Sequence, residues 1–108
     1  MKTRLDVIEQ AYRRLGIKAA DEALTADMEA YAGAALDALY DELSEFAQMD
    51  WWPEEIPEKV FIPLANLLAS EIGPAYMVAV EPRGRPFARL MAVLRPDDRE
   101  ETPDAVYY

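Results

Sequence analysis

The chain of 108 residues contains no cysteine and no histidine. Without cysteine, disulfide bonds and thiolate chemistry are excluded. Without histidine, the commonest general base and the commonest metal ligand are both missing. The four glycines stand isolated at positions 16, 33, 73 and 84, so the sequence has no glycine-rich phosphate loop. These absences predict a protein without catalytic, cofactor-binding or metal-binding residues.

Long apolar runs are also missing. No apolar stretch approaches the length of a membrane span, and residues 1–15 carry charge throughout instead of the apolar centre of a signal peptide. Hydrophobic residues make up 52% of the chain and charged residues 30%, which at this length favours one folded domain. We therefore expect a protein that folds in a cytoplasm and does not bind a membrane.

The net charge of −10 is distributed in blocks. Residues 19–58 contain twelve acidic residues and no basic one, whereas residues 82–96 contain four arginines and no acidic residue. So acidic a chain is a poor candidate for binding nucleic acid, because phosphate contacts require clustered lysine and arginine. We hypothesise that the opposite blocks meet between neighbouring subunits. Pairing within one subunit is the alternative.

The spacing of apolar residues predicts helices in the first half of the chain. The first helix begins at Thr3, where Asp6 completes a variant of the capping box, and ends at Gly16. Thr25 is the N-cap of a long amphipathic helix that we expect over residues 26–48.

The second half is interrupted by prolines. Pro57 suits the first turn of a third helix, in which Pro63 predicts either a kink or a later start. We expect residues 75–80 to continue as helix, residues 81–86 to form a loop, and residues 87–94 to form one more short helix. The pattern predicts an all-α fold, a small helical bundle of about four to five helices with one long central helix.

An extended C-terminal arm is expected to follow the bundle, with the bundle domain over residues 1–95 and the arm over residues 96–108. The arm is mostly acidic and carries two adjacent tyrosines, whose rings give a large contact area at small entropic cost. We interpret it as a docking arm that binds a partner through Pro103, Val106, Tyr107 and Tyr108.

Two further groups of residues are candidates for contacts with other proteins. Small residues on a second face of the long helix permit close approach of another helix, although alanine is also simply the best helix former. Trp51 and Trp52 precede Pro53, which favours extended backbone, so we expect one ring to cover the core and the other to lie at the surface or meet a partner. The subunit-interface candidates are Ala30, Ala34, Ala38, Asp37, Asp41, Arg83, Arg85 and Arg89.

Acidic side chains supply the only residues suited to catalysis. A pair of carboxylates drawn from Glu54, Glu55, Glu58 and Glu71 would suit a small muralytic hydrolase. In a chain with 21 acidic residues, however, neighbouring carboxylates arise by default and usually form a solvated face. We expect no enzymatic activity.

The order of motifs resembles a known family. "VIEQAYRRLGI" is followed by a long acidic helix, "DMEAYAGAALDALYDELSEFAQ", then by a tryptophan break, an "IPE" restart and "PLANLLASEIG". Over most of residues 5–73 this pattern resembles the head–tail connector (adaptor) proteins of tailed bacteriophages. Leu15-Gly16 and Ile56-Pro57 are the most telling points.

The resemblance implies a structural virion protein in the neck of the particle, assembled in the host cytoplasm. Such a subunit would form a dodecameric ring beneath the portal protein, extend the DNA channel without binding DNA specifically, and present a platform to a downstream tail protein. Its C-terminal arm would dock on the portal. The alternatives are a generic helical protein–protein interaction module that binds one partner, and the small muralytic hydrolase.

Overall fold

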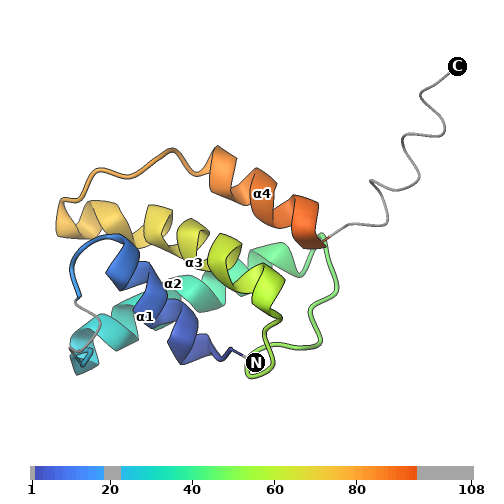
Figure 1. Ribbon diagram of the computed structural model, residues 1–108, viewed down its shortest axis with the longest axis horizontal. Coiled ribbons are helices and arrows are strands. Elements are labelled where there is room, and N and C mark those ends of the chain that lie inside the picture. Colours follow the sequence, from blue (N-terminus) through green and yellow to red (C-terminus); the bar gives the residue numbers. More distant parts are fainter. Residues whose placement is uncertain (1, 19–22, 95–108) are drawn as a thin grey trace, which may run out of the picture.

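A computed structural model describes residues 2–18 and 23–94. Within these ranges the chain forms four α-helices, one short 3₁₀ helix and no strand (Figure 1). This confirms the all-α fold. The arm and the boundary expected at residues 95–96 lie outside the described residues. The elements are α1 (Arg4–Arg14), α2 (Ala26–Leu43), α3 (Glu58–Ile72), η1 (Gly73–Tyr76) and α4 (Gly84–Leu94).

Helix α3 lies at the centre of the bundle. Figure 1 shows it between α4 on one side and α1 and α2 on the other, and it contacts all of them. The longest helix, as expected, is α2, and the helices on which it packs are α1 and α3. Central packing suits α3, because a helix that is covered on several sides must be apolar over most of its circumference. Its buried residues are Val60, Leu64, Ala65, Leu67, Leu68, Ala69 and Ile72.

The starts predicted for the first two helices are confirmed. The Asp6 carboxylate accepts a hydrogen bond from the Thr3 backbone N–H at 2.9 Å, and the Thr3 hydroxyl accepts one from the Asp6 N–H at 3.3 Å. Thr25 caps α2 by accepting a hydrogen bond from the Met28 N–H at 3.1 Å. Gly16 follows α1 with φ +78°, a left-handed conformation that glycine adopts without strain.

The ends of α2 and α3 differ from expectation. Helix α2 stops at Leu43 rather than near residue 48, and the Ser44 hydroxyl donates a hydrogen bond to the Asp41 carbonyl at 2.9 Å. A serine that bonds the backbone in this way competes with continuation of the helix. Helix α3 begins directly after Pro57, its N-cap, and runs through Pro63. Pro63 removes one N–H from the ladder, a loss that the packing around α3 outweighs.

The prediction of a helix over residues 75–80 is wrong. Helix η1 ends at Tyr76, Met77 takes a left-handed conformation with φ +61°, and residues 78–82 carry no helix. Val78 and Val80 are half-buried whereas Ala79 between them is exposed, the alternation of an extended chain. The expected loop over residues 81–86 is shorter than predicted, because α4 begins at Gly84 with Pro86 in its first turn.

A short backbone bridge aligns the beginnings of α1 and α3. The Lys2 N–H donates to the Ile56 carbonyl at 3.2 Å, and the Ile56 N–H donates to the Lys2 carbonyl at 2.9 Å. Ile56 itself is fully buried. In the described part of the chain, no helix is both long and apolar enough to cross a bilayer.

Candidate functional site

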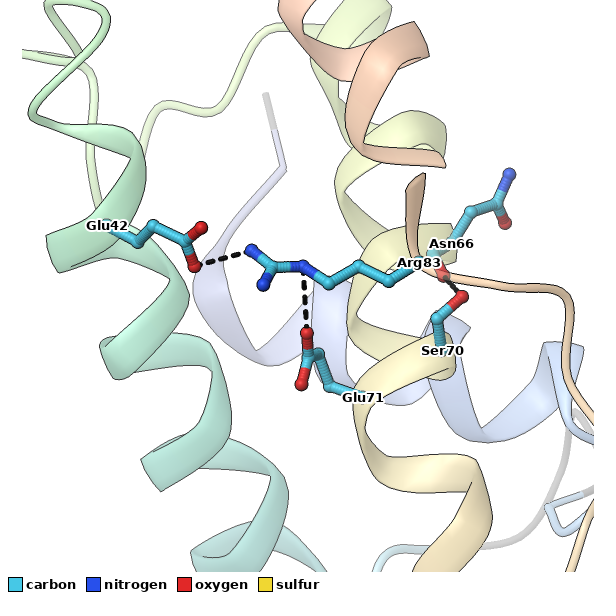
Figure 2. A network of polar contacts seen from close by, with 5 residues as sticks. All are labelled: Glu42, Asn66, Ser70, Glu71 and Arg83. Carbon is cyan, nitrogen blue, oxygen red and sulfur yellow. Dashed lines mark hydrogen bonds and ion pairs between the residues drawn. The ribbon is translucent and has the colours of Figure 1, made fainter. Parts of the chain in front are cut away.

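Arg83 joins three elements just before α4 begins. Its guanidinium binds Glu42 of α2 and, through Nε at 3.1 Å, Glu71 of α3 (Figure 2). The same guanidinium lies over the ring of Phe87, 5.3 Å from the ring centroid. Phe87 in turn meets Phe46 edge to face. Arg83 therefore holds the start of α4 against both α2 and α3.

The other two candidate arginines of the basic block remain largely in solvent. Arg85 and Arg89 approach the same carboxylate, that of Glu81, at 3.8 and 4.0 Å. Their side chains stay 72% and 55% exposed, so these pairs leave most of both guanidinium groups available to other molecules. Within one chain, the acidic and basic blocks are thus joined through Arg83. Arg85 and Arg89 are therefore the arginines that remain as candidates for contacts between subunits.

One part of the small-residue face of α2 is covered by Arg4 of the same subunit, and the rest is exposed. Arg4 of α1 binds Asp37 through two hydrogen bonds of 3.0 and 3.1 Å and lies against Gly33, where an added Cβ would come within 2.6 Å of the guanidinium. Asp37 is therefore engaged by its own subunit. The remaining candidates on this helix are all exposed and make no ion pair within the described residues: Ala30, Ala34, Ala38 and Asp41.

Both tryptophans pack at the edge of the core. The ring of Trp52 stacks on Tyr40 with centroids 4.9 Å apart, and Trp51 meets Trp52 edge to face. Both are half-buried against the core cluster, whereas we expected one ring to cover the core and the other to lie at the surface or meet a partner. The backbone from residue 50 to residue 54 forms turns rather than an extended segment, which places the two rings on the same side.

A hollow of about 150 Å³ lies where α1 ends, beside the middle of α3 and under the connection from η1 to α4. Leu15, Ala69, Val78 and Val80 give it apolar walls. Its polar lining comes from Arg14, Asn66, Ser70 and Glu81. The Ser70 hydroxyl donates to the Asn66 backbone carbonyl at 3.3 Å, while the Asn66 side chain points away from the Arg83 network (Figure 2).

The hollow could not be foreseen from the sequence. Arg14 and the extended segment at Val80 are distant in the chain, and they meet because α1 and the connection lie against the same stretch of α3. We expected helix at the connection, which would have placed its side chains differently. A weak signal was available in the two valines, Val78 and Val80, which alternate as in a strand.

The hydrogen bonds of a buried tyrosine were also missed. Tyr12 is fully buried, and its hydroxyl donates to the Met28 carbonyl at 2.8 Å and lies 2.7 Å from the Tyr76 hydroxyl. Burial, followed by the hydrogen bond and charge interaction with Tyr76, raises the pKa of Tyr12. This contact joins α1, α2 and η1, and its role is to hold helices together.

Of the carboxylates considered for catalysis, three lie in solvent and one is bound to an arginine. Glu54, Glu55 and Glu58 are exposed in and after the turn, whereas Glu71 is bound to Arg83. Among residues 2–18 and 23–94, no cluster of three or more acidic, histidine or cysteine side chains could hold a metal ion.

The four residues expected to dock on a partner, Pro103, Val106, Tyr107 and Tyr108, lie outside the described residues. The described residues thus present three surface features: a basic edge on α4, an exposed alanine and aspartate face on α2, and the hollow beside the end of α1. Comparison of the chain with protein-family models, with curated proteins and with solved structures gave no match.

Proposed function

We propose that this chain is a structural virion protein, the head–tail adaptor of a tailed bacteriophage. In this proposal it forms a ring beneath the portal protein, extends the DNA channel and carries the next tail protein. The proposal assigns no catalysis and no cofactor to the chain. The observation that carries it is the order of motifs: a short capped helix, a long acidic helix, a tryptophan break, and a restart at Ile56-Pro57-Glu58.

The distribution of exposed side chains supports an assembling subunit. Asp41 and the neighbouring alanines lie exposed on α2, and Arg85 and Arg89 lie exposed on α4. Figure 1 shows these two helices on different sides of α3. Two complementary surfaces on different sides of one subunit make a head-to-tail contact, which closes into a ring when the rotation between subunits allows it. The acidic face of α2 also suits a channel wall, because negative charge repels the DNA phosphates.

Mass measurement tests the proposal. The chain is purified alone and then mixed with the portal protein encoded in the same genome, and the complex is measured by native mass spectrometry and imaged by cryo-electron microscopy. We expect a ring of adaptor subunits on the portal. A complex with a single partner and no ring would favour the small helical interaction module instead.

The arm is tested in the same assay. Removal of residues 105–108 should abolish or strongly weaken binding to the portal, since buried aromatic residues carry a large share of binding energy at interfaces. Charge reversal of Arg85 and Arg89 should instead weaken contacts between adaptor subunits while the arm still binds. If both variants assemble normally, the adaptor assignment of these residues is wrong.

A further inference from the structure

The hollow beside Arg14 has the size and the walls to hold one aromatic ring. Its volume is about 150 Å³, close to that of a cavity known to accept benzene. Leu15, Ala69 and Val80 supply apolar contacts. The Gly73 backbone passes close by, with Val80 and Leu15 packed so tightly on it that an added Cβ would lie 2.4 and 3.1 Å from their side chains. The walls are therefore fixed by close packing.

At the rim of the hollow, the lining itself holds one cation and one acid, and two further arginines stand beside that acid. Arg14 lines one side and makes no ion pair within the described residues. On the other side, Glu81 is the carboxylate that Arg85 and Arg89 share at 3.8 and 4.0 Å. Because Glu81 already has two arginine partners, Arg14 is the lining charge without an ion pair in the described residues, and the net charge of these four groups is positive. A ligand that pairs an aromatic ring with several carboxylates matches this arrangement.

Hydrogen-bonding groups are also available at this position. The backbone N–H groups of Ala79 and Val80 make no hydrogen bond to any described residue, and the side-chain amide of Asn66 makes none either. Successive N–H groups of an extended chain point to opposite sides, so one of these two can pair with the backbone of a peptide that lies in the hollow. The ligand class that fits all three features is an acidic, extended peptide segment with an aromatic side chain.

We propose that this ligand is residues 97–108 of the same chain, with the ring of Tyr107 or Tyr108 in the hollow. The segment reads DDREETPDAVYY, five acidic residues, one arginine and two tyrosines. Its charge is thus opposite to that of the rim. The inference does not rest on the adaptor assignment. If both hold, a portal that binds these tyrosines must first displace them from the subunit.

The length of the chain allows the contact. From Leu94 to Tyr108 there are fourteen residues, which span up to about 46 Å when extended. The segment has to return along α4, eleven residues or about 16 Å long, to Glu81, which lies three residues before α4 begins. Covalent attachment gives an effective concentration of order millimolar. The segment of the same chain therefore outcompetes that of a second copy at micromolar protein concentration.

Paramagnetic relaxation in the full-length protein tests the proposal. Because the chain has no cysteine, Thr102→Cys provides a single position for a nitroxide label. In a ¹⁵N-labelled sample we expect strong broadening of the backbone amides of Asn66, Ser70 and Val80. A second sample mixes two proteins. One is ¹⁵N-labelled, has the natural cysteine-free sequence and carries no nitroxide; the other is the nitroxide-labelled Thr102→Cys variant without ¹⁵N. This sample should show no broadening of these amides, because the contact is within one chain.

Two charge reversals provide a matched pair. Arg14→Glu should reduce the broadening by about twofold to fivefold, the range that partly exposed ion pairs support. Arg13→Glu makes the same change of charge one residue away, where the side chain donates to Gln10 and does not line the hollow, and should leave the broadening intact. The double variant Tyr107→Ser with Tyr108→Ser should lose it. The amide spectrum of each variant reports whether the bundle is folded.

Three outcomes would overturn the proposal. The first is the absence of broadening at the hollow in the labelled full-length protein. The second is broadening that occurs only in the mixed sample, which would assign the hollow to a second copy. The third is an equal loss in Arg13→Glu and Arg14→Glu, which would indicate unspecific attraction. None of these measurements uses the portal, so failure here is distinguishable from failure of the proposed function.

Discussion

Helices α1 and α4 both pack on α3, but they are held there by different interactions. α1 contributes Val7, Ile8, Ala11 and Tyr12, each with no exposed surface. α4 contributes two fully buried residues, Pro86 and Leu90, and its remaining apolar side chains are only partly buried. The α1 contact is therefore part of the core, whereas the α4 contact lies at its edge.

The polar contacts that hold the two helices also differ, because α1 has a backbone bridge whereas α4 depends on side-chain ion pairs. α1 begins with a capping box and is attached by the backbone bridge between Lys2 and Ile56, beside which Arg4 pairs with Asp37 of α2. α4 is fixed at its start by the ion pairs of Arg83, whose partners Glu42 and Glu71 are 40% and 34% exposed. Exposed ion pairs contribute little and are screened by salt. We expect α4 to open locally at a lower free energy than α1.

Replacing one apolar residue in each helix gives the largest expected effect. Ile8→Ala empties a fully buried position and should lower the free energy of unfolding by about 2–5 kcal/mol. Met91→Ala removes a half-buried side chain and should cost clearly less, because its site is partly open to solvent. Denaturant titration of both variants measures the difference. Equal losses would show that α4 belongs to the core as fully as α1 does.

The next largest effect is expected at Gly73, where η1 follows α3. Gly73 has helical backbone angles, so an alanine there carries no conformational penalty. Its Cβ would nevertheless stand 2.4 Å from Val80 and 3.1 Å from Leu15. Gly73→Ala should cost about 1–3 kcal/mol through overpacking. Thermal unfolding of Gly73→Ala beside Gly84→Ala, where nothing lies within 4 Å, separates this steric effect from loss of glycine itself.

The helical parts of this fold were accessible from the sequence because their signals are local. Thr3 and Asp6 form a capping box within one turn, and the periodicity of α3 follows from its own apolar residues. The connection after η1 was missed because its conformation depends on a left-handed Met77 and on packing of Val80 against Gly73. Tertiary contacts of this kind leave no periodic pattern in the sequence.

The candidate site could be predicted from the sequence only in part, because it too depends on tertiary contacts. The blocks of charge were evident, but the distribution of Arg83, Arg85 and Arg89 between internal and solvent positions depends on where the start of α4 sits. Helix content and charge could be predicted, whereas the hollow beside Arg14 requires three segments brought together by the fold.

Tyr12→Phe should have an intermediate effect. Because the single hydroxyl proton of Tyr12 goes to the Met28 carbonyl, Tyr76 must donate to Tyr12. The substitution removes both hydrogen bonds and should cost about 0.5–1.5 kcal/mol. A substitution that proves neutral in denaturant titration would show that α1 is held by its apolar residues alone.

The same variant should change the response to alkaline pH. The pKa of Tyr12 is raised above its ordinary value of 10.0, chiefly by burial. The unfolded chain therefore ionises first, and this contribution to stability is complete below pH 10 and is lost as the pH rises further. The advantage of the natural chain over Tyr12→Phe should shrink above that pH. An advantage that grew with pH would contradict the assigned direction.

The smallest effect is expected at Arg83, and it bears most directly on the comparison of the two helices. Arg83→Gln removes ion pairs whose side chains are about 34–42% exposed, so the loss should stay below about 1 kcal/mol. The difference from the natural chain should shrink as salt rises, since the screening length falls from about 10 Å at 0.1 M to about 3 Å at 1 M. Arg13→Gln, which removes a cation without an ion pair in the described residues, is the control. Hydrogen exchange should quicken in α4 and stay unchanged in α1, because the ion pairs of Arg83 hold the start of α4 and do not involve α1. A loss of several kcal/mol that salt does not affect, with exchange raised equally in both helices, would mean that Arg83 supports the core and that α4 is no more weakly held than α1.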